Sequence, residues 1–383
     1  MVKILTSESV TEGHPDKVCD RISDAILDAH LKEDKYSRVA CECLIANNAL
    51  YIGGEITSEA RVDIEDIARK TIKRIGYIDN SSGFDVDNAE IVVNITKQSE
   101  DIAVGVIKDK INAGDQGMVY GFACDETLNY MPFTIDTAHK LAKRLEEVRK
   151  ENIIKKLYPD GKTQVSAVYD KFGNVKSIDS VVIAAQHHKD VDIGKLRCEI
   201  IEKVIFEVVD KKLLSPLTKL HINTTGVFSK GGPAADTGLT GRKIIVDTYG
   251  GIARHGGGAF SGKDASKADR TASYLARYIA KNVVAANLAK RCEVEMSFII
   301  GKEAAQTIYI NTFRTNLVSE EVIADAVMNT FDLTIDNTIN EFNLRSPIYE
   351  ELSSYGHFGR NPDKFLWERT DKVNILRAKC KLI

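Results

Sequence analysis

The sequence predicts an α+β fold of three βαββαβ units packed with pseudo-threefold symmetry around a shared axis. The apolar residues give the same order of strands and helices three times along the chain, although the residues themselves do not repeat. Each unit also contains two neighbouring strand patterns of the kind that form a hairpin. The helices are amphipathic, so each unit is expected to cover one face of its sheet with helices.

The chain has 383 residues, which is too long for one ordinary core. We divide it into an N-terminal unit 2–98, a mobile active-site loop 99–117, a central unit 118–228 and a C-terminal unit 229–383. The loop is too apolar for a plain linker and too short for a domain. We therefore expect a lid, because such loops often carry binding residues.

The N-terminal unit opens with a strand and a helix, which a hairpin follows. Asn47-Asn48 predicts the hairpin turn because Asn tolerates positive φ, and Gly76 is expected to end the second helix. The expected elements are a strand at Ile4–Val10, a helix at Asp16–Leu31, strands at Arg38–Ala46 and Leu50–Ile56, a helix from Glu59 to Ile75 and a strand at Glu90–Lys97.

The other two units follow the same order of elements. In the central unit we expect strands at Met118–Cys124, Thr163–Tyr169, Val175–Ala185 and Lys219–Asn223, with helices at Ile135–Lys150 and Asp192–Lys212. In the C-terminal unit we expect strands at Lys243–Asp247, Glu293–Ile300 and Thr307–Thr312, with helices at Asp264–Lys290 and Ser319–Asn329. A closing segment broken by Gly and Pro begins at Tyr355.

Composition excludes several classes of protein. With 43% hydrophobic residues, 28% charged residues and a net charge of −3, the chain resembles soluble globular proteins and carries no global signal for nucleic acid or anionic membrane. The N-terminus lacks the pattern of a secretory signal, and no apolar segment is long enough to span a membrane. We therefore expect a cytoplasmic enzyme.

Seven cysteines are present, an odd number without repeated C-x-x-C spacing. This argues against a disulfide framework and against a structural zinc site, and it predicts reduced thiols. Cys41 and Cys43 alternate with Glu42 in a strand pattern. Both thiols should therefore face a core while Glu42 faces the opposite side.

The stretch Gly241–Lys267, GRKIIVDTYGGIARHGGGAFSGKDASK, combines many glycines with clustered cations. Its backbone N–H groups, backed by the dipole of the helix that follows, are expected to bind a polyphosphate. Lys263 and Lys267 would share one face if that helix starts near Lys263. A flexible surface loop is the alternative, but the cations Arg242, Lys243, Arg254, His255, Lys263 and Lys267 favour anion binding.

The same stretch almost matches the P-loop pattern G-x-x-x-x-G-K-[ST] from Gly257 to Lys263. Asp264 stands where the Mg²⁺-binding hydroxyl should be, and more than ten residues separate the preceding strand from Gly257. Asp264 fits better as a helix cap. We therefore reject an ordinary P-loop NTPase.

Two shorter motifs place reactive groups at turns. TEGHPDK puts His14 and Asp16 at the entrance of a helix, where a simple capped helix start is the alternative interpretation. Asp115 lies between two glycines, where turn chemistry alone could explain it. The Pro-Asp-Gly-Lys segment around Lys162 also has the composition of an ordinary turn.

Together, the motifs SESVTEGHPDK, GGEIT, KQS, NAGDQG, GLTGRKIIVDTYGG and ARHGGGAFSGKDASK resemble those of S-adenosylmethionine synthases (methionine adenosyltransferases) of the bacterial and eukaryotic type. The resemblance runs from Thr6 to Asp371. It implies that ATP, L-methionine and water give S-adenosylmethionine, phosphate and diphosphate. It also implies two Mg²⁺ per site, K⁺, and a homodimer with active sites at the interface, paired into a tetramer.

The resemblance assigns a role to each matching residue. Catalytic roles fall to His14, Lys162, Arg242, Lys243, Lys263 and Lys267. ATP binding falls to His14, Asp160, Lys162, Val227, Phe228, Asp236, Arg242, Lys243, Ala259 and Lys263. Methionine binding falls to Glu55, Gln98, Asp115, Asp236 and Lys267, Mg²⁺ binding to Asp16 and Asp269, and K⁺ binding to Glu42.

Two departures from the family pattern concern the nucleotide and the lid. Val227 stands where the family has Arg, a loss for which Lys230 could compensate. The family's Lys-Gln-Ser-Pro-Asp is here Lys97 to Asp101 with Glu100 in place of Pro, and the lid looks a few residues shorter. Both departures affect binding and lid kinetics more than the chemistry.

Two other functions stay open at this point. A phosphotransferase or simple ATPase would rest on the near-P-loop and would release ADP, which the adenosyl reaction does not. A non-catalytic nucleotide-binding subunit would be favoured by losing His14 or the lysines, yet all of these residues are present. The adenosyl reaction needs no general base for its first step, because neutral sulfur attacks C5′ of ATP and cations stabilise the departing triphosphate.

Overall fold

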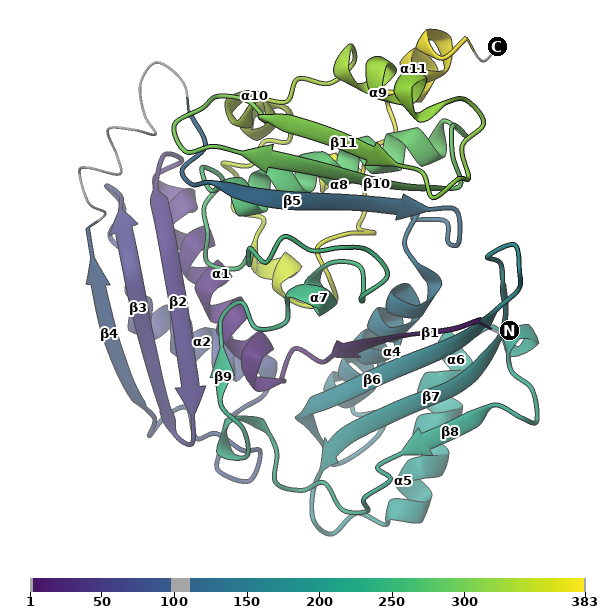
Figure 1. The fold of residues 1–383 in the computed structure, drawn as a ribbon. Coiled ribbons are helices and arrows are strands. Elements are labelled where there is room, and N and C mark those ends of the chain that lie inside the picture. Colours follow the sequence, from purple (N-terminus) through teal and green to yellow (C-terminus); the bar gives the residue numbers. More distant parts are fainter. Residues whose placement is uncertain (1–2, 98–110, 382–383) are drawn as a thin grey trace.

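The computed structural model describes residues 3–97 and 111–381, and three β-sheets surround a common centre in it (Figure 1). Their strand orders are β4-β3-β2-β9, β1-β6-β7-β8 and β11-β10-β5. The strands are β1 Lys3–Val10, β2 Arg38–Ala46, β3 Ala49–Thr57, β4 Glu90–Thr96, β5 Gly117–Cys124, β6 Leu157–Tyr169, β7 Val175–His187, β8 Lys219–Ile222, β9 Gly238–Leu239, β10 Arg291–Phe298 and β11 Thr307–Asn311.

One long helix packs on each sheet: α1 on β2, α4 on β1 and β6, and α8 on β5 and β10. The helices are α1 Pro15–Glu33, α2 Ile64–Ile75, α4 Phe133–Lys150, α5 Ile193–Ile200, α6 Phe206–Val208, α7 Ile244–Asp247, α8 Ala268–Ala285, α9 Glu320–Met328, α10 Ile335–Glu341 and α11 Val373–Lys379. In the described part of the chain, no helix has the length and apolar character needed to cross a membrane.

The α+β class and the two local turn predictions are confirmed. Asn47 has φ 52° in the turn between β2 and β3, and Gly76 ends α2 with φ 111°. All seven cysteines are free thiols, as their number and spacing predict. Cys41 and Cys43 are buried while Glu42 between them is exposed, so this strand also faces the way its alternation indicates.

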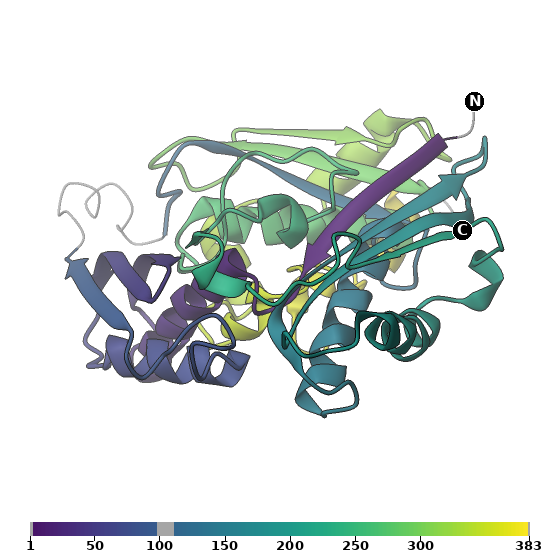
Figure 2. The same ribbon diagram turned by 90° about the horizontal axis from the view of Figure 1, so that it is seen from below.

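The sheets differ from three contiguous units because strands are exchanged between them. β1, from the start of the chain, pairs antiparallel with β6, and in the view from below it runs beside the teal strands of the central sheet (Figure 2). β5 pairs with β10 in the C-terminal sheet, and β9 pairs with β2 in the N-terminal sheet. Each sheet is therefore completed by a strand from another part of the chain.

The buried core follows the same exchange. One continuous apolar cluster joins α1, α2 and β2 to α8 and β10, so the N-terminal and C-terminal regions share a core. A second cluster lies between α4, α5 and the β6–β7 hairpin. This arrangement places α1 between the sheets (Figure 1), where its side chains Asp16 and Asp24 accept the N–H groups of Leu239 and Gly262.

The predicted strand at Lys243–Asp247 is wrong, because this segment forms the short helix α7. The N–H of Asp247 donates to the carbonyl of Lys243 at 2.9 Å, and the carboxylate of Asp247 contacts Lys17 in the interior. An apolar run of three residues fits a buried helical turn as well as a strand, and here the buried ion pair selects the turn.

Three predicted helix limits also need correction. α8 begins at Ala268 rather than Asp264, because Asp264 lies alongside β2. There its carboxylate accepts the N–H of Val39, and its own N–H donates to the carbonyl of Val39. α2 begins at Ile64, since Asp63 caps it through the N–H of Asp66. The helix expected to reach Lys212 ends at Val208, after a π-helical stretch Ile201–Ile205.

His139 on α4 is buried against β1, and its protonation provides a test of this packing. Its Nδ1 lies 2.8 Å from Ser9 Oγ on β1, and burial, aided by the charges of Arg360 and Lys17, lowers its pKa to about 3. Because the unfolded chain has an ordinary histidine pKa near 6.5, it binds a proton that the folded state does not. The stability that neutral His139 provides is therefore lost as the pH falls below about 6.5.

The parent should lose about 2 kcal/mol of unfolding free energy between pH 7.5 and pH 5 because of His139. We expect His139→Gln to remove this part of the loss. Urea unfolding at the two pH values measures this difference. His221→Gln is the matched control, because the side chain of His221 is exposed. An equal pH dependence in parent and His139→Gln would contradict the assignment.

Candidate active site

Helix α1 carries four buried aspartates at every fourth residue, and we call them the α1 carboxylate row. They are Asp16, Asp20, Asp24 and Asp28, with exposures of 1%, 0%, 0% and 7%. Side chains four apart lie on the same face of a helix, and four such positions span about 18 Å. The row therefore runs along one side of α1 through the centre of the molecule.

Each carboxylate in the row accepts backbone N–H groups from the second half of the chain. The donors are Leu239 to Asp16 at 3.0 Å, Gly241 to Asp20 at 2.8 Å, Gly262 to Asp24 at 2.8 Å, and Tyr349 and Glu350 to Asp28 at 3.0 and 2.8 Å. Leu239 lies just before the glycine-rich stretch, and Gly241 and Gly262 lie within it. Helix α1 thus fixes the path of that stretch by hydrogen bonds to its backbone.

A first group of candidate residues gathers at the start of α1. His14 caps the helix, is 2% exposed, and accepts the N–H of Asp16 on Nδ1 at 3.2 Å. Lys243 Nζ lies 2.6 Å from Asp16 Oδ2, and Arg242 Nε lies 3.6 Å from Asp16 Oδ1. Burial and the nearby charge of Lys243 lower the pKa of His14 to about 3, so its ring is neutral at pH 7.

Strand β6 adds Asp160 and Lys162 to this group. Asp160 Oδ2 accepts the N–H of Gly232 at 2.9 Å, while its other oxygen is buried and has no hydrogen-bond partner within the described residues. Burial raises the pKa of Asp160 to about 6, against the opposing effects of that hydrogen bond and of Lys162. Lys162 is exposed and pairs with Val10, which places it close to His14.

The segment from Val227 to Asp236 borders the first group. Asp236 is exposed, lies beside Gly232 through a backbone hydrogen bond of 3.2 Å, and acts electrostatically on Asp160. Phe228 is half-buried and exchanges two hydrogen bonds with His187, at 3.0 and 3.1 Å. Val227 is 58% exposed beside it. We define the α1-start group as His14, Asp16, Asp160, Lys162, Val227, Phe228, Asp236, Arg242 and Lys243.

A second group lies along the edge of β2. Lys263 forms a β-bridge with Ala40 on β2, and Ala40 pairs on its other side with Glu55 on β3. Lys263 and Glu55 are therefore two strand spacings apart, which is about 10 Å. Lys263 Nζ lies 2.6 Å from Asp269 in the first turn of α8, and Lys267 caps that helix. Glu55 is exposed, whereas the two lysines are half-buried. We define the β2-edge group as Glu55, Lys263, Lys267 and Asp269.

Four further candidates lie outside these two groups or at their margins. Glu42 is exposed on β2, opposite Gly53. Asp115 is exposed in a loop that Ala113 joins to Gly301 and Lys302 by hydrogen bonds of 2.9 Å each. Ala259 approaches Gly241, so closely that a Cβ on that glycine would lie 2.6 Å away. Gln98 lies outside the described residues.

The two groups do not converge on one point within the described part of the chain. Lys243 pairs with Asp16, whereas Lys263 pairs with Asp269. The backbone donors that lead to them, Leu239 and Gly262, are bound by Asp16 and Asp24, about 12 Å apart along α1. The structure therefore brings together each half of the predicted site but not the whole.

The glycine-rich stretch differs from the predicted phosphate cradle. The N–H groups of Gly241, Gly257 and Gly262 donate to Asp20, His255 and Asp24, so they are already used inside the protein. Lys263 and Lys267 do not share a helix face, because α8 begins after both. These three amides are thus not available to an anion, whereas the side-chain cations of the stretch are.

Arg254 also departs from its expected place in the cationic cluster. Its Nε lies 2.9 Å from Glu293 and its Nη1 lies 2.9 Å from Glu295, both on β10. Its guanidinium also stacks on Tyr120 at 4.8 Å from the ring centroid. These contacts join the loop to the C-terminal sheet and leave Arg254 neutralised.

Sequence reasoning missed the buried ion cluster that supports the first group. Lys17 is fully buried, lies 2.9 Å from Asp20 and contacts Asp247, the last residue of α7. Because α7 follows Lys243 directly, this cluster helps to hold Lys243 against Asp16. The spacing of four between the aspartates of a predicted helix was the signal that could have found it.

The carboxylates offer only a partial metal site. Within residues 3–97 and 111–381, no three His, Cys, Asp or Glu side chains come close enough together to hold a metal ion. Asp16 and Asp269 each stand beside a lysine at 2.6 Å. A single carboxylate of this kind fits Mg²⁺, which proteins often hold through one or two carboxylates together with substrate phosphates and water.

Comparison with known families decides between the possible functions. The N-terminal, central and C-terminal domains of S-adenosylmethionine synthetase match residues 2–100, 110–228 and 230–369 respectively. The chain belongs to the S-adenosylmethionine synthetase family. Its activity is therefore that of a methionine adenosyltransferase, which forms S-adenosylmethionine from ATP and L-methionine. The match covers all three units, and the resemblance of the motifs is thereby confirmed.

The unfolding free energy of this synthetase is expected to depend on the buried cation Lys17. Lys17→Met would leave Asp20 and Asp247 buried without their partner, and we expect it to cost about 3–5 kcal/mol of unfolding free energy. Lys32→Met on the exposed side of the same helix should change stability by less than about 0.5 kcal/mol. Urea unfolding measures both variants, and equal stability of the two would contradict the role given to Lys17.

Proposed function

We propose that the α1-start group of one protomer and the β2-edge group of a partner subunit form one catalytic site in a homodimer. The motivation is that each group is assembled within the chain while the two stay apart. Two such sites would follow from the symmetry of a dimer, because each protomer supplies both halves. Two dimers would pair into a tetramer, as the family resemblance implies.

The open face of the β4-β3-β2-β9 sheet supports this assembly. Leu44, Tyr51 and Val92 are 41%, 43% and 43% exposed there, on the side opposite α1. Glu42 and Glu55 lie on the same face. A contiguous apolar surface of this kind is typical of a protein interface, and its carboxylates would then lie at the subunit boundary.

In this site the chain's cations receive the leaving triphosphate. Lys162, Arg242 and Lys243 lie around His14, and their charges would stabilise the oxygen that departs from C5′. His14 uses Nδ1 as an acceptor, so its proton is on Nε2, from which it can donate to that oxygen. The sulfur of methionine needs no general base, because it attacks as a neutral nucleophile.

The substrates are oriented by the remaining residues. We assign the adenosyl part to Phe228, Val227, Ala259 and Asp160, whose unpaired oxygen can accept a hydrogen bond from the nucleoside. We assign the methionine to Glu55, Gln98, Asp115, Asp236 and Lys267, with the carboxylates facing its ammonium and the lysine facing its carboxylate. Lys263 and Lys267 would contact the far end of the triphosphate from the partner side.

Asp16 and Asp269 would each hold one Mg²⁺, and Glu42 would contribute to a K⁺ site at the interface. Mg²⁺ neutralises charge on the phosphate oxygens when it is bound. Lys243 and Lys263 would then keep both ends of the triphosphate fixed while water hydrolyses it to phosphate and diphosphate. We further propose a cytoplasmic location and the unit boundaries given by 2–98, 99–117, 118–228 and 229–383.

Product analysis tests this function. The protein incubated with ATP, L-methionine, Mg²⁺ and K⁺ should give S-adenosylmethionine, phosphate and diphosphate in equal amounts, without ADP. Lys263→Ala should lower kcat/KM at least about a hundredfold, because it removes a charge that contacts the leaving group, while the unfolding free energy changes by less than about 1 kcal/mol. Liquid chromatography and urea unfolding give the two quantities.

Two outcomes would contradict the proposal. Formation of ADP would indicate phosphoryl transfer instead of adenosyl transfer. Equal collapse of activity and stability in Lys263→Ala would mean that the loop is structural. Mixing two inactive variants, Lys243→Ala and Lys263→Ala, tests the shared site, because heterodimers should recover one active site in two only if the halves come from different protomers.

A further inference from the structure

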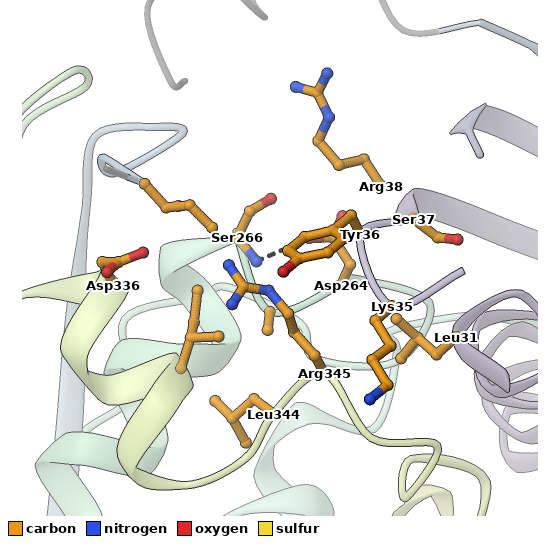
Figure 3. A pocket seen from close by; sticks show the side chains of 13 residues that line it. Leu31, Lys35, Tyr36, Ser37, Arg38, Asp264, Ser266, Asp336, Leu344 and Arg345 are labelled. Atoms are coloured by element: carbon orange, nitrogen blue, oxygen red, sulfur yellow. Dashed lines mark hydrogen bonds between the residues drawn. The ribbon is translucent and has the colours of Figure 1, made fainter. Parts of the chain in front are cut away.

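A cavity of about 340 Å³ lies behind the glycine-rich stretch, between the end of α1, the start of β2 and helix α10 (Figure 3). Its volume is in the range of small-molecule sites. None of the described residues assigned above to ATP, methionine or metal lines it. Among the described residues, the cavity therefore shares no lining residue with the proposed catalytic site.

The floor of the cavity is apolar, and a cation stands at its centre. Leu31, Ile339 and Leu344 are buried and form the floor. Arg345 stands next to Tyr36 inside the cavity, with its guanidinium carbon 4.9 Å from the ring centroid (Figure 3). Tyr36 is 75% exposed, so the ring face that Arg345 does not cover is available to another planar group.

Within the described part of the chain, the cations of the cavity form no ion pair with an acid. Arg345 donates from Nη1 to Asn340 Oδ1 at 3.3 Å, and neither it nor Lys35 or Arg38 forms an ion pair within the described residues. A guanidinium without a carboxylate partner beside an apolar floor is a favourable partner for an organic anion, because charge-assisted hydrogen bonds strengthen away from water.

Two acids also line the cavity, and both accept hydrogen bonds, Asp336 from the side-chain amide of Asn340 at 3.3 Å. Asp264 is 4% exposed, and its two oxygens accept the N–H groups of Val39 and Ser266 at 2.8 and 2.7 Å. Asp336 stands across the cavity from Arg345 (Figure 3). Its carboxylate should oppose an anion, which makes it a sensitive position for a test.

The wall of the cavity includes the segment between Lys263 and Lys267, the two lysines of the β2-edge group. Ala265 and Ser266 line it, and they connect Lys263 to Lys267. We propose that the cavity is an effector site for a small organic anion with a planar apolar body. The anion pairs with Arg345, its body stacks on Tyr36 and covers the apolar floor, and its contact with the 265–266 wall holds both lysines in place for ATP.

Calorimetry with 2-naphthoate tests binding, and neutral 2-naphthamide serves as the matched ligand. Naphthoate should bind the parent one to one, and the amide at least about tenfold more weakly. Tyr36→Ala and Arg345→Gln should each weaken naphthoate binding about tenfold, whereas Asp336→Asn should tighten it about threefold. Lys32→Ala, on exposed α1 surface outside the cavity, should leave it unchanged.

Kinetics test the effector role. Naphthoate at a concentration that just saturates the parent should lower the KM for ATP at least about twofold, because a braced wall reduces the ordering cost of binding. The same concentration should lower it less in Arg345→Gln, which binds naphthoate about tenfold more weakly. Equal binding of the amide, weaker binding in Asp336→Asn, or an unchanged or raised KM would overturn the proposal. Displacement of naphthoate by ATP would also overturn it, because the cavity would then belong to the catalytic site. Parent-like unfolding of Arg345→Gln by urea confirms that the variant is folded.

Discussion

The rest of the structure depends on the pairing of the α1 carboxylate row with backbone N–H groups from the second half of the chain. A carboxylate removed from water is unstable unless hydrogen bonds and cations compensate for the lost hydration. Asp24 illustrates the solution, because Arg270 binds it through two hydrogen bonds of 2.8 and 2.9 Å while Gly262 donates from the backbone. Asp16 and Asp24 thus gain their cationic partners, Lys243 and Arg270, only when the second half of the chain is in place.

This constraint links the fold to the catalytic site. The strand exchanges place α1 between the sheets, and the shared core of the N-terminal and C-terminal regions holds it there. Asp16 then serves two purposes, since it binds the N–H of Leu239 and fixes Lys243 beside His14. Because the same helix also binds Gly262, the positions of Lys243 and Lys263 are set against one common element.

Much of the secondary structure could be predicted because local patterns decide it. The hairpin at Asn47 and the helix end at Gly76 depend on residues that tolerate positive φ. The short helix α7 could not be predicted, since it depends on the ion pair between Lys17 and Asp247, which are far apart in sequence. The late start of α8 has the same kind of cause, because Asp264 binds Val39 on another strand.

The candidate site, like the secondary structure, could be predicted only in part. Motifs of the family identified its residues one by one, but they could not show which residues meet. The structure groups Lys263 with Asp269, six residues along the chain, and Lys243 with Asp16, a pair that is remote in sequence and that no local spacing contains. It also uses the N–H groups of Gly241 and Gly262 within the protein, so these two amides are not left for the substrate.

Hydrogen exchange of the free protein tests the central role of the carboxylate row most directly. The amides of Gly241 and Gly262 should exchange slowly although both lie in a loop, because Asp20 and Asp24 accept them at 2.8 Å. In Asp20→Ala, which removes the acceptor, exchange at Gly241 should become at least about tenfold faster, while strand β5 stays as protected as in the parent. Fast exchange of both glycines in the parent, or unchanged exchange at Gly241 in Asp20→Ala, would contradict the account.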